Sequence, residues 1–310
     1  MVKIEKDNFT VNSVNNYYKI DNLKAKEDGI TVILTASIHG DEIKASVFAF
    51  DLLNIYSLKD EINDNIKTII IYPFINKSGI RNKSRDAVWF GNNNNDCYEN
   101  SDVDYRESIK YIIHEYTNDK LLLIDIHTSK NIIPSLIIDQ TDSKCTKLEY
   151  MLDLFNGADN KIEPIRYHND LETLKRYVNK NIENGYAYTY EFGTSELFST
   201  DTFVDNIYDF INLASDEIYD GKFDKKIKNK IVVKTVPLNS PCSGIIEYAP
   251  VGVYNAGDDI AIVHDLYEYE NIISVIKAPS TGCFVSCVTD YYIDIGEVFG
   301  YFNMYYEKVE

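Results

Sequence analysis

The sequence contains few cysteines, and their spacing favours neither a disulfide framework nor a thiolate metal site. The chain has five cysteines in 310 residues, an odd number, and no two of them form a CxxC pattern. They are Cys97, Cys145, Cys242, Cys283 and Cys287. Disulfide scaffolds and thiolate zinc sites need cysteines paired at characteristic spacings. Any metal bound by this chain is therefore expected to have nitrogen and oxygen ligands.

Long hydrophobic runs are also missing, and acidic residues outnumber basic ones. No apolar run approaches the roughly 20 residues that a membrane span needs, and the opening stretch MVKIEKDNFTVNS lacks the apolar core of a signal peptide. The 49 acidic and 31 basic residues give a formal net charge of -18, which would repel phosphate backbones and anionic membrane surfaces. We expect a cytoplasmic protein that acts on a small molecule, with neither nucleic acid nor a membrane as partner. The sequence does not determine the oligomeric state, and a homo-oligomer is one of the alternatives.

The first two thirds of the chain alternate short β-branched runs with stretches of helical apolar spacing. The expected strands cover residues 29–40, 66–76, 120–129, 135–139 and 186–195. The expected helices cover residues 42–58, 104–117, 144–157 and 201–219. Apolar runs of this length are typical of buried parallel strands. The pattern predicts an α/β fold with a mixed, mostly parallel sheet flanked by helices on both faces.

The pattern changes after the lysine-rich segment DGKFDKKIKNK, residues 220–230. Beyond it, residues 241–263 align with residues 279–302 through matching Pro-Gly and Gly-acid turns between short apolar runs. These glycine turns predict a small all-β module, barrel-like or sandwich-like, made of two similar halves. We therefore expect an α/β domain at 1–228 and the β module at 229–310, as suits a chain longer than one common domain.

The stretch TASIHGDEIKAS, residues 35–46, places a histidine and a carboxylate three residues apart at an expected helix start. His39 and Glu42 at this spacing lie on one face, within reach of a common ion. Alone, the pair favours a structural explanation over a metal site. Asp41 or Glu42 would stabilise the helix N-terminus electrostatically, and His39 would be an ordinary loop residue.

A third ligand candidate, His127, stands in LLLIDIHTS at the end of an expected buried strand. Ligands bind at the carboxyl ends of strands in α/β sheets. Asp125 lies two residues earlier on the same strand face, where it could orient the imidazole or guide a loop at the site. His39, Glu42 and His127 supply two nitrogens and one carboxylate, the set that suits catalytic zinc with a position left for water.

A catalytic site of this kind also needs a base, and Glu191 is the candidate. It ends the aromatic strand in YAYTYEFGTS. Glu191 could take a proton from water as it attacks a carbonyl and then deliver that proton to the leaving amine. The alternative is an ordinary solvated carboxylate at a strand end.

These motifs together resemble a known family. HxxE in SIHGDE, DxH in DIHTS and the glutamate of YEFG occur in the order and approximate spacing of zinc carboxypeptidases, and most closely of the succinylglutamate desuccinylase and aspartoacylase branch. Members of that branch also carry a small C-terminal β module, so the resemblance covers nearly the whole chain. It implies a zinc carboxypeptidase-like fold and one zinc ion per chain, held by His39, Glu42 and His127. It also implies that Glu191 is the general base and acid.

The resemblance further implies an arginine that stabilises the oxyanion, in a segment that begins with Asn and ends with Arg. The segment NKSGIRNKSR fits, with Arg85 at the expected separation from Asn76. Arg81 is a second candidate for contact with the substrate. An oxyanion donor accelerates a reaction on the order of 100 to 1,000-fold. The alternative for either arginine is a solvated loop charge.

The chain departs from the family where an Asp-Leu-Asn-Arg motif binds the substrate carboxylate, because it has WFGNNNNDCYEN instead. Asn95 keeps the asparagine, but Asp96 replaces the arginine and cannot grip a carboxylate. Arg106 or Arg166 could fill in from another loop. If Asp96 faces the cleft, the substrate is expected to be cationic or amine-bearing.

The sequence therefore predicts a zinc-dependent hydrolase that cleaves the amide bond of a small N-acylated compound. Two alternatives stay open: a metallocarboxypeptidase acting on a short peptide, and a catalytically inactive metal-dependent protein that binds a small ligand. The C-terminal module also resembles biotinyl and lipoyl carriers. However, the stretch between its halves, residues 264–273, has no lysine to carry such a group, and Lys277 lies beside the second turn. The module is interpreted as structural or as a lid over the site.

Overall fold

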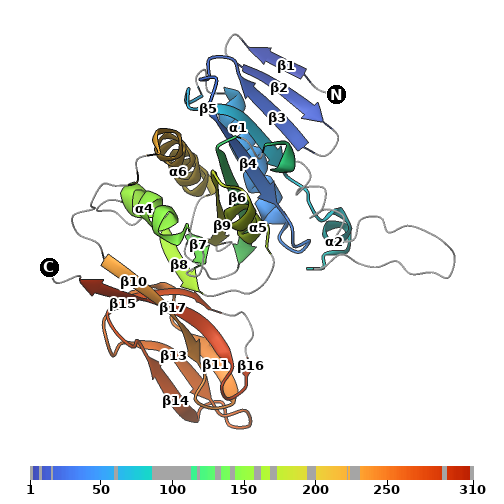
Figure 1. Cartoon of the computed structure of the whole chain (residues 1–310). Coiled ribbons are helices and arrows are strands. Elements are labelled where there is room, and N and C mark those ends of the chain that lie inside the picture. The colour runs from blue at the N-terminus through green and yellow to red at the C-terminus, as the bar shows by residue number, and fades with distance from the viewer. Residues whose placement is uncertain are drawn as a thin grey trace.

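The structure of the protein is a computed structural model. It describes residues 3–6, 9–14, 17–58, 62–85, 113–116, 119–129, 134–139, 144–156, 162–167, 173–193, 200–221, 223, 231–287 and 292–307. Figure 1 shows a large sheet covered by helices and, beyond its β8 edge, a smaller part built of strands alone. The two parts adjoin where β10 runs close to β8.

The large sheet has nine strands in the order β1-β2-β3-β5-β4-β6-β9-β7-β8. The strands are β1 (Lys3–Lys6), β2 (Phe9–Val14), β3 (Tyr17–Asn22), β4 (Ile30–Ala36), β5 (Ile66–Tyr72), β6 (Leu121–Ser129), β7 (Ser135–Asp139), β8 (Glu163–Tyr167) and β9 (Gly185–Gly193). The centre, β5-β4-β6-β9, is parallel. β1, β2 and β3 form an antiparallel meander that joins β5, and β7 is antiparallel to β9. The predicted mixed sheet is confirmed, but the expectation that it is mostly parallel is wrong. Among the described strands, four pairs are parallel, three in the centre and β7-β8. Four are antiparallel, because the β1-β2-β3 meander adds three such pairs and β7 adds one.

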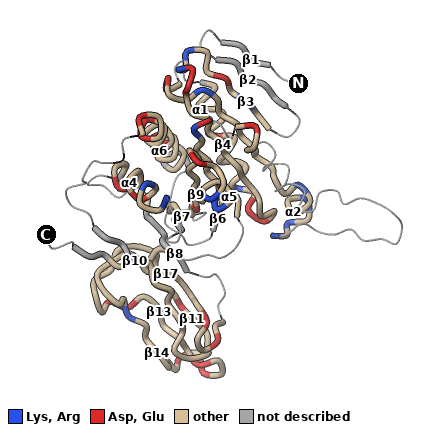
Figure 2. The backbone as a smooth tube through the Cα atoms, in the orientation of Figure 1, with Lys and Arg blue, Asp and Glu red and all other residues tan. Residues whose placement is uncertain are grey.

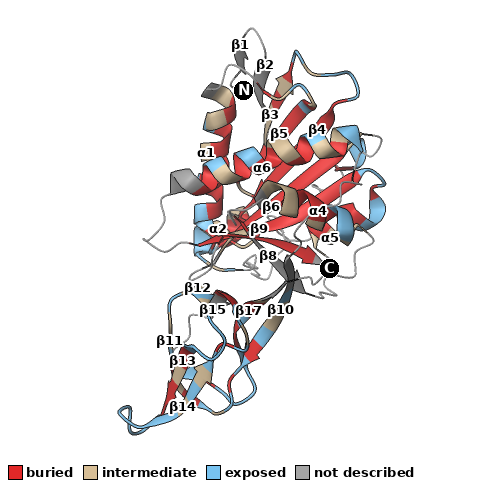
Figure 3. Cartoon of the chain, turned by 90° about the vertical axis from the view of Figure 1, so that its left-hand side faces the viewer, coloured by how far each residue is buried: buried red, intermediate tan, exposed pale blue. Residues whose placement is uncertain are grey.

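Helices cover the large sheet on both faces. The described helices are α1 (Ile43–Leu58), α2 (Lys77–Asn82), α4 (Cys145–Asn156), α5 (Leu174–Asn181) and α6 (Thr200–Asp220). α1, α4 and α6 pack on one face, and α5 packs on the other. In Figure 3 the central strands β4, β5, β6 and β9 are largely buried, whereas the helices that cover them carry exposed residues on their outer sides. Of the helix expected at 104–117, residues 113–115 are helical, and most of the rest lies outside the described residues.

The smaller part consists of two antiparallel sheets, ordered β10-β17-β15-β12 and β14-β13-β11-β16. Their strands are β10 (Ile231–Asn239), β11 (Gly244–Tyr248), β12 (Gly252–Tyr254), β13 (Asp259–His264), β14 (Ile272–Lys277), β15 (Gly282–Cys287), β16 (Tyr292–Ile293) and β17 (Val298–Glu307). A separate apolar core that includes Phe284, Phe299 and Phe302 lies within this part. An all-β arrangement was expected after residue 228. The 228/229 boundary itself lies outside the described residues and stays a prediction.

The two turns that matched in the sequence also have matching local structure. Gly257 and Gly296 both adopt the left-handed conformation, with φ of 89° and 85°. The acidic residue after each glycine accepts a hydrogen bond from the backbone N–H three residues before it, at 2.8 Å for Asp258 and 2.9 Å for Glu297. Glycine is favoured here because a left-handed turn penalises a side chain. A two-repeat organisation of the whole module stays a prediction.

Charged residues of both signs are interspersed along the described chain, without a continuous basic stretch (Figure 2). Among the described residues, the helices are too short or too polar to cross a membrane. The expected cytoplasmic location and the expected lack of a nucleic-acid partner stay predictions.

Candidate metal centre and active site

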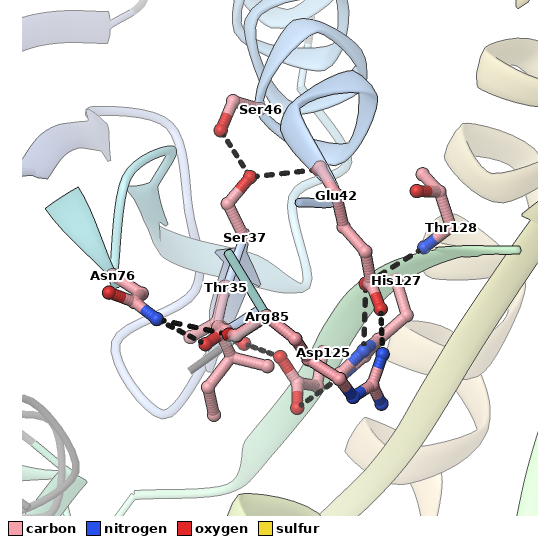
Figure 4. A network of polar contacts seen from close by, with 10 residues as sticks. Thr35, Ser37, Glu42, Ser46, Asn76, Arg85, Asp125, His127 and Thr128 are labelled. Carbon is pink, nitrogen blue, oxygen red and sulfur yellow. Dashed lines mark hydrogen bonds and ion pairs between the residues drawn. The ribbon is translucent and has the colours of Figure 1, made fainter. Parts of the chain in front are cut away.

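The candidate site begins at the turn between β4 and α1. Ser37, directly after β4, has a φ of 53°, a left-handed conformation that costs a residue with a side chain roughly 1–2 kcal/mol. The hydroxyls of Ser37 and Ser46 lie 2.5 Å apart, and each also contacts a carbonyl, that of Glu42 at 3.0 Å for Ser37 and that of Pro73 for Ser46. The two hydroxyl hydrogens are shared among these contacts, which link the turn to the start of α1 and to the residue after β5. Figure 4 shows Ser37 between Glu42 and Ser46. The turn therefore holds His39 and Glu42 at the carboxyl end of the parallel strands.

The sheet brings the three predicted metal ligands together. Ligand atoms of His39, Glu42 and His127 all lie within 4.8 Å of one another, the one such group found in the part of the chain that the structure describes. The Glu42 Oε2 and His127 Nδ1 atoms are 3.1 Å apart, and the two imidazole centroids are 5.0 Å apart. Glu42 and His127 are buried, and His39 is half-buried. Two nitrogens and a carboxylate oxygen form a donor set that fits a divalent cation such as zinc.

Buried neighbours orient the His127 imidazole. Asp125 lies on the same face of β6, and its Oδ2 is 3.1 Å from His127 Nε2. The other carboxylate oxygen of Asp125 accepts a hydrogen bond from the Thr35 hydroxyl on β4 at 2.7 Å. Nε2 is thereby engaged, and Nδ1 faces Glu42. A histidine that ligates a metal commonly donates its other ring N–H to a carboxylate in this way.

The charges within this group stabilise one another. Burial alone would raise the pKa of Glu42, but the hydrogen bond and positive charge of His127 outweigh it, so the pKa is lowered. Burial alone would lower the pKa of His127, but the charge and hydrogen bond of Asp125 raise it well above the usual value. Burial, followed by the charge of His127, lowers the pKa of His39. Since a cation binds the deprotonated imidazole, we expect its binding to displace a proton.

Glu191 lies beside this group because β9 pairs in parallel with β6. In that register Glu191 is the partner of His127. Burial raises the pKa of the half-buried Glu191 carboxyl to about 7, with His127 opposing the shift and Glu42 adding to it. A carboxyl that titrates near neutral pH can both accept and donate a proton during a reaction. The sequence predicted Glu191 at a strand end, but this register could not be read from sequence.

Of the two candidate arginines, Arg85 contacts the group. Its Nη1 is 3.1 Å from Glu42 Oε1, and its side chain is 58% exposed, so the guanidinium remains accessible. The other oxygen of Glu42 accepts a hydrogen bond from the backbone N–H of Thr128 at 3.1 Å. Arg81 lies in the last turn of α2 and is exposed.

Apart from Arg81, the structure does not describe the side chains suggested for substrate binding. Asn95, Asp96 and Arg106 lie outside the described residues. Arg166 is in β8, but its side chain is not described. The roles suggested for them stay predictions.

Sequence reasoning missed the hydroxyl groups that support the site, Thr35 and Ser37. One signal was available for Thr35: it alternates with Leu34 and so shares the face of Ile33 on β4, as Asp125 shares the face of His127 on β6. Ser37 follows the end of β4 in a left-handed conformation, so strand alternation does not place its side chain. The contribution of the Thr128 backbone N–H had no sequence signal.

A parallel sheet that presents two imidazoles and a carboxylate beside a carboxyl and an arginine is typical of metal-dependent hydrolases. The family described as the succinylglutamate desuccinylase/aspartoacylase catalytic domain matches residues 28–207. This match covers more than half of the chain, and the chain belongs to that family.

Solved structures resemble the chain over nearly its whole length. An aspartoacylase family protein from Mesorhizobium loti MAFF303099 is 16% identical, with a TM-score of 0.68 over 97% of this chain and 94% of that one. A succinylglutamate desuccinylase/aspartoacylase from Rhodobacter sphaeroides is 14% identical, with a TM-score of 0.66 over 97% and 95%. The ectoine utilization protein EutE (DoeB) from Ruegeria pomeroyi is 17% identical, with a TM-score of 0.58 over 93% and 88%. At these identities the likeness shows the fold alone. A comparison with curated proteins found no match.

Proposed function

We propose that the protein is a metal-dependent hydrolase that cleaves the amide bond of a small N-acylated compound. The observation that carries the proposal is the convergence of three groups: the cluster of His39, Glu42 and His127, the Glu191 carboxyl beside it, and the Arg85 guanidinium on Glu42. Membership of a family named for desuccinylase and aspartoacylase supports deacylation.

The metal is proposed to be zinc, held by His39, Glu42 and His127. The donor set supports it, since zinc in hydrolases commonly takes two histidines and one glutamate. When bound, such a cation polarises a carbonyl and lowers the pKa of water to about 7. Asp125 would keep the imidazole of His127 turned toward the cation through the 3.1 Å contact with Nε2.

Glu191 would move the proton. Its carboxylate would accept a proton from the water that attacks the amide carbon and would then donate that proton to the departing amine nitrogen. A pKa of about 7, raised by burial, supports both directions of transfer near neutral pH. The neighbouring position of His127 in β6 keeps the carboxyl close to the reacting group.

Arg85 would stabilise the oxyanion that forms on the former carbonyl oxygen. Its guanidinium lies at Glu42 and is accessible, so it can donate to a substrate bound at the same place. A donor of this kind contributes about 100 to 1,000-fold in rate.

The proposed substrate class is a small N-acyl compound, consistent with the names of the solved structures that share the fold. Recognition of its remaining groups falls to the segment around Asn95 and Asp96 in this proposal. Asp96 stands where the resembled motif has an arginine, so an amine-bearing substrate is proposed over one with a free carboxylate.

Metal content tests the proposal directly. Plasma mass spectrometry should find near-stoichiometric zinc in the purified protein and almost none in a His39→Ala, His127→Ala double variant of unchanged circular dichroism. His114→Ala, which changes a histidine of the short helix at 113–115, is the matched control and should keep the metal.

Turnover of N-acyl amino acids, N-acyl amines and short peptides would then be measured. Hydrolysis of N-acyl compounds supports the deacylase, and hydrolysis of peptides alone would favour the carboxypeptidase alternative. A protein that binds no metal even after zinc is supplied would overturn the proposal.

A further inference from the structure

The side chain of Asn76 is fully buried, with 0% of its surface exposed, although it stands in a loop between β5 and α2. It is the N-cap of α2, a six-residue helix. An N-cap needs only one side-chain oxygen to accept from the helix backbone, and helix caps are ordinarily solvated. The burial of the whole amide indicates that Asn76 has partners besides the helix.

Those partners use the full hydrogen-bonding capacity of the amide. Its oxygen accepts from the backbone N–H of Gly79 at 2.7 Å and from the Ser78 hydroxyl at 3.3 Å. Its nitrogen donates to the carbonyl of Ile38 at 3.3 Å and to the carbonyl of Arg85 at 3.3 Å. A primary amide offers two donor hydrogens and one acceptor oxygen with two lone pairs, so every site is engaged. In Figure 4 dashed lines mark the bonds that the Asn76 side-chain nitrogen donates.

The two carbonyls that Asn76 binds belong to the two halves of the candidate site. Ile38 directly precedes the ligand candidate His39 in the chain. The second carbonyl belongs to Arg85, whose side chain contacts Glu42. The Arg85 carbonyl also accepts from the backbone N–H of Gly40 at 3.0 Å. The loop that carries the ligand candidates and the loop that carries the arginine are therefore joined through one buried amide.

A close backbone approach fixes the spacing of the same two loops. A Cβ atom added at Gly40 would lie 2.1 Å from the carbonyl carbon of Gly79 and 2.4 Å from the Ile80 nitrogen. A Cβ added at Gly79 would lie 2.6 Å from the Asn76 side-chain nitrogen. Gly40 is needed because its backbone packs directly against the backbone of α2 at Gly79 and Ile80. Gly79 is needed because a side chain there would meet the Asn76 side chain.

We infer that Asn76 is a positioning residue, which sets the Arg85 guanidinium relative to Glu42 by tying the Arg85 main chain to the loop that holds His39. The inference rests on the proposed function for the role given to Arg85. The tie matters because the Arg85 side chain is 58% exposed, so its position depends on few contacts: the ion pair with Glu42, and the bonds that Gly40 and Asn76 make to its carbonyl. A misplacement of about 1 Å can cost on the order of 100-fold in rate.

Asn76→Asp separates the two duties of the amide. The carboxylate still caps α2, because it accepts from Gly79, but it cannot donate to the carbonyls of Ile38 and Arg85. Asn82→Asp is the matched control, since it makes the same chemical change on the exposed side of α2, where Asn82 donates to the Ser78 carbonyl. Asn76→Ser serves as a second variant that keeps a capping oxygen without adding a buried charge.

The first readout needs neither metal nor turnover. Each variant is treated with phenylglyoxal, which modifies arginine, and the modification of individual arginines is followed by peptide mass spectrometry. In Asn76→Asp and Asn76→Ser the rate at Arg85 should rise severalfold while the rate at Arg81, an exposed arginine of α2, stays unchanged. Equal rates at Arg85 in the wild type and both variants, or an equal rise at both arginines, would overturn the inference.

The second readout is a double-mutant cycle on kcat. Asn76→Asp should lower kcat about 10- to 100-fold in the wild-type background and by less than about twofold in an Arg85→Met background, because the group that it positions is already gone. The same fold loss in both backgrounds would show a general structural role and overturn the inference. If the wild type binds no metal and hydrolyses nothing, the proposed function fails, whereas the phenylglyoxal rates still decide the position of Arg85.

Discussion

The same three strands, β4, β6 and β9, present two very different faces. The face toward α1, α4 and α6 is apolar from end to end, with Leu34, Ile124 and Tyr188 all fully buried. The opposite face is apolar in the middle of the strands, at Ile33, Leu123 and Ala187, and turns polar as the strands reach their carboxyl ends. Because side chains alternate along a strand, one segment can supply the core and the site at the same time.

The buried polar groups of this face are stabilised by hydrogen bonds to one another rather than by contact with solvent. Thr35 donates to Asp125, Asp125 contacts His127, and His127 lies against Glu42, which also accepts from the backbone of Thr128. Buried charges are costly unless they are paired in this way. The comparison predicts that substitutions on the apolar face reduce stability, whereas substitutions on the polar face reduce metal binding or turnover.

The largest effect on turnover is expected at Glu191. Its neighbour in the chain, Phe192, points to the opposite face of the sheet. Glu191→Gln should lower kcat by about 100- to 10,000-fold, because the amide cannot carry the proton. Its zinc content and melting temperature should match the wild type, since a neutral amide is no harder to bury than a carboxylate. Steady-state kinetics and thermal unfolding measure the two quantities.

Phe192→Leu is the matched variant on the other face, where Phe192 is 1% exposed and packs against Phe48. It should lower the melting temperature and leave kcat within about twofold, because the packing it disturbs lies on the far side of the sheet. Unchanged turnover in Glu191→Gln would remove the proposed base and leave a metal-dependent binding protein as the better explanation.

A second pair of variants compares the two faces at neighbouring residues of β6. Ile124→Ala should reduce the free energy of unfolding by about 2–5 kcal/mol through a cavity beneath α1 without changing the zinc affinity of the folded protein. Asp125→Asn should weaken zinc affinity roughly 10- to 100-fold, because the imidazole loses its orienting carboxylate. Urea unfolding in the presence of a chelator and competition titration of zinc measure the two effects. Similar losses of zinc affinity in both variants would mean that the faces are not separate.

The apolar face explains why much of the fold could be predicted from the sequence. Strands buried on both sides occur as nearly continuous apolar runs, so β4, β5, β6 and β9 were expected within a few residues of their bounds. The strands β1, β2 and β3 have no such run, because they form an antiparallel meander rich in Asn and Lys, and they were missed. The helix α5 was missed as well, although Thr173 caps it and Leu174 and Val178 have helical spacing.

The candidate site was predictable only where side chains carry the chemistry. His39, Glu42, His127 and Glu191 stand in short motifs at strand and helix ends. The bonds of Asn76 could not be predicted, because its nitrogen binds main-chain carbonyls, one of them 38 residues away. Every residue type has a main-chain carbonyl, so the residue types do not indicate which carbonyl a side chain will bind. The register between β6 and β9 likewise becomes known only in the folded sheet.

The smallest effect is expected at Thr35, two steps from the proposed metal. Thr35→Val keeps the shape of the side chain and its burial, but it removes the 2.7 Å hydrogen bond to Asp125. Because one such bond contributes about 1 kcal/mol, zinc affinity should fall roughly fivefold, less than in Asp125→Asn. Thr35→Ser keeps the hydroxyl and should bind zinc nearly as the wild type does. Chelator competition measures all three proteins, and equal affinities for the Val and Ser variants would show that the polar face ends at Asp125 rather than extending across β4.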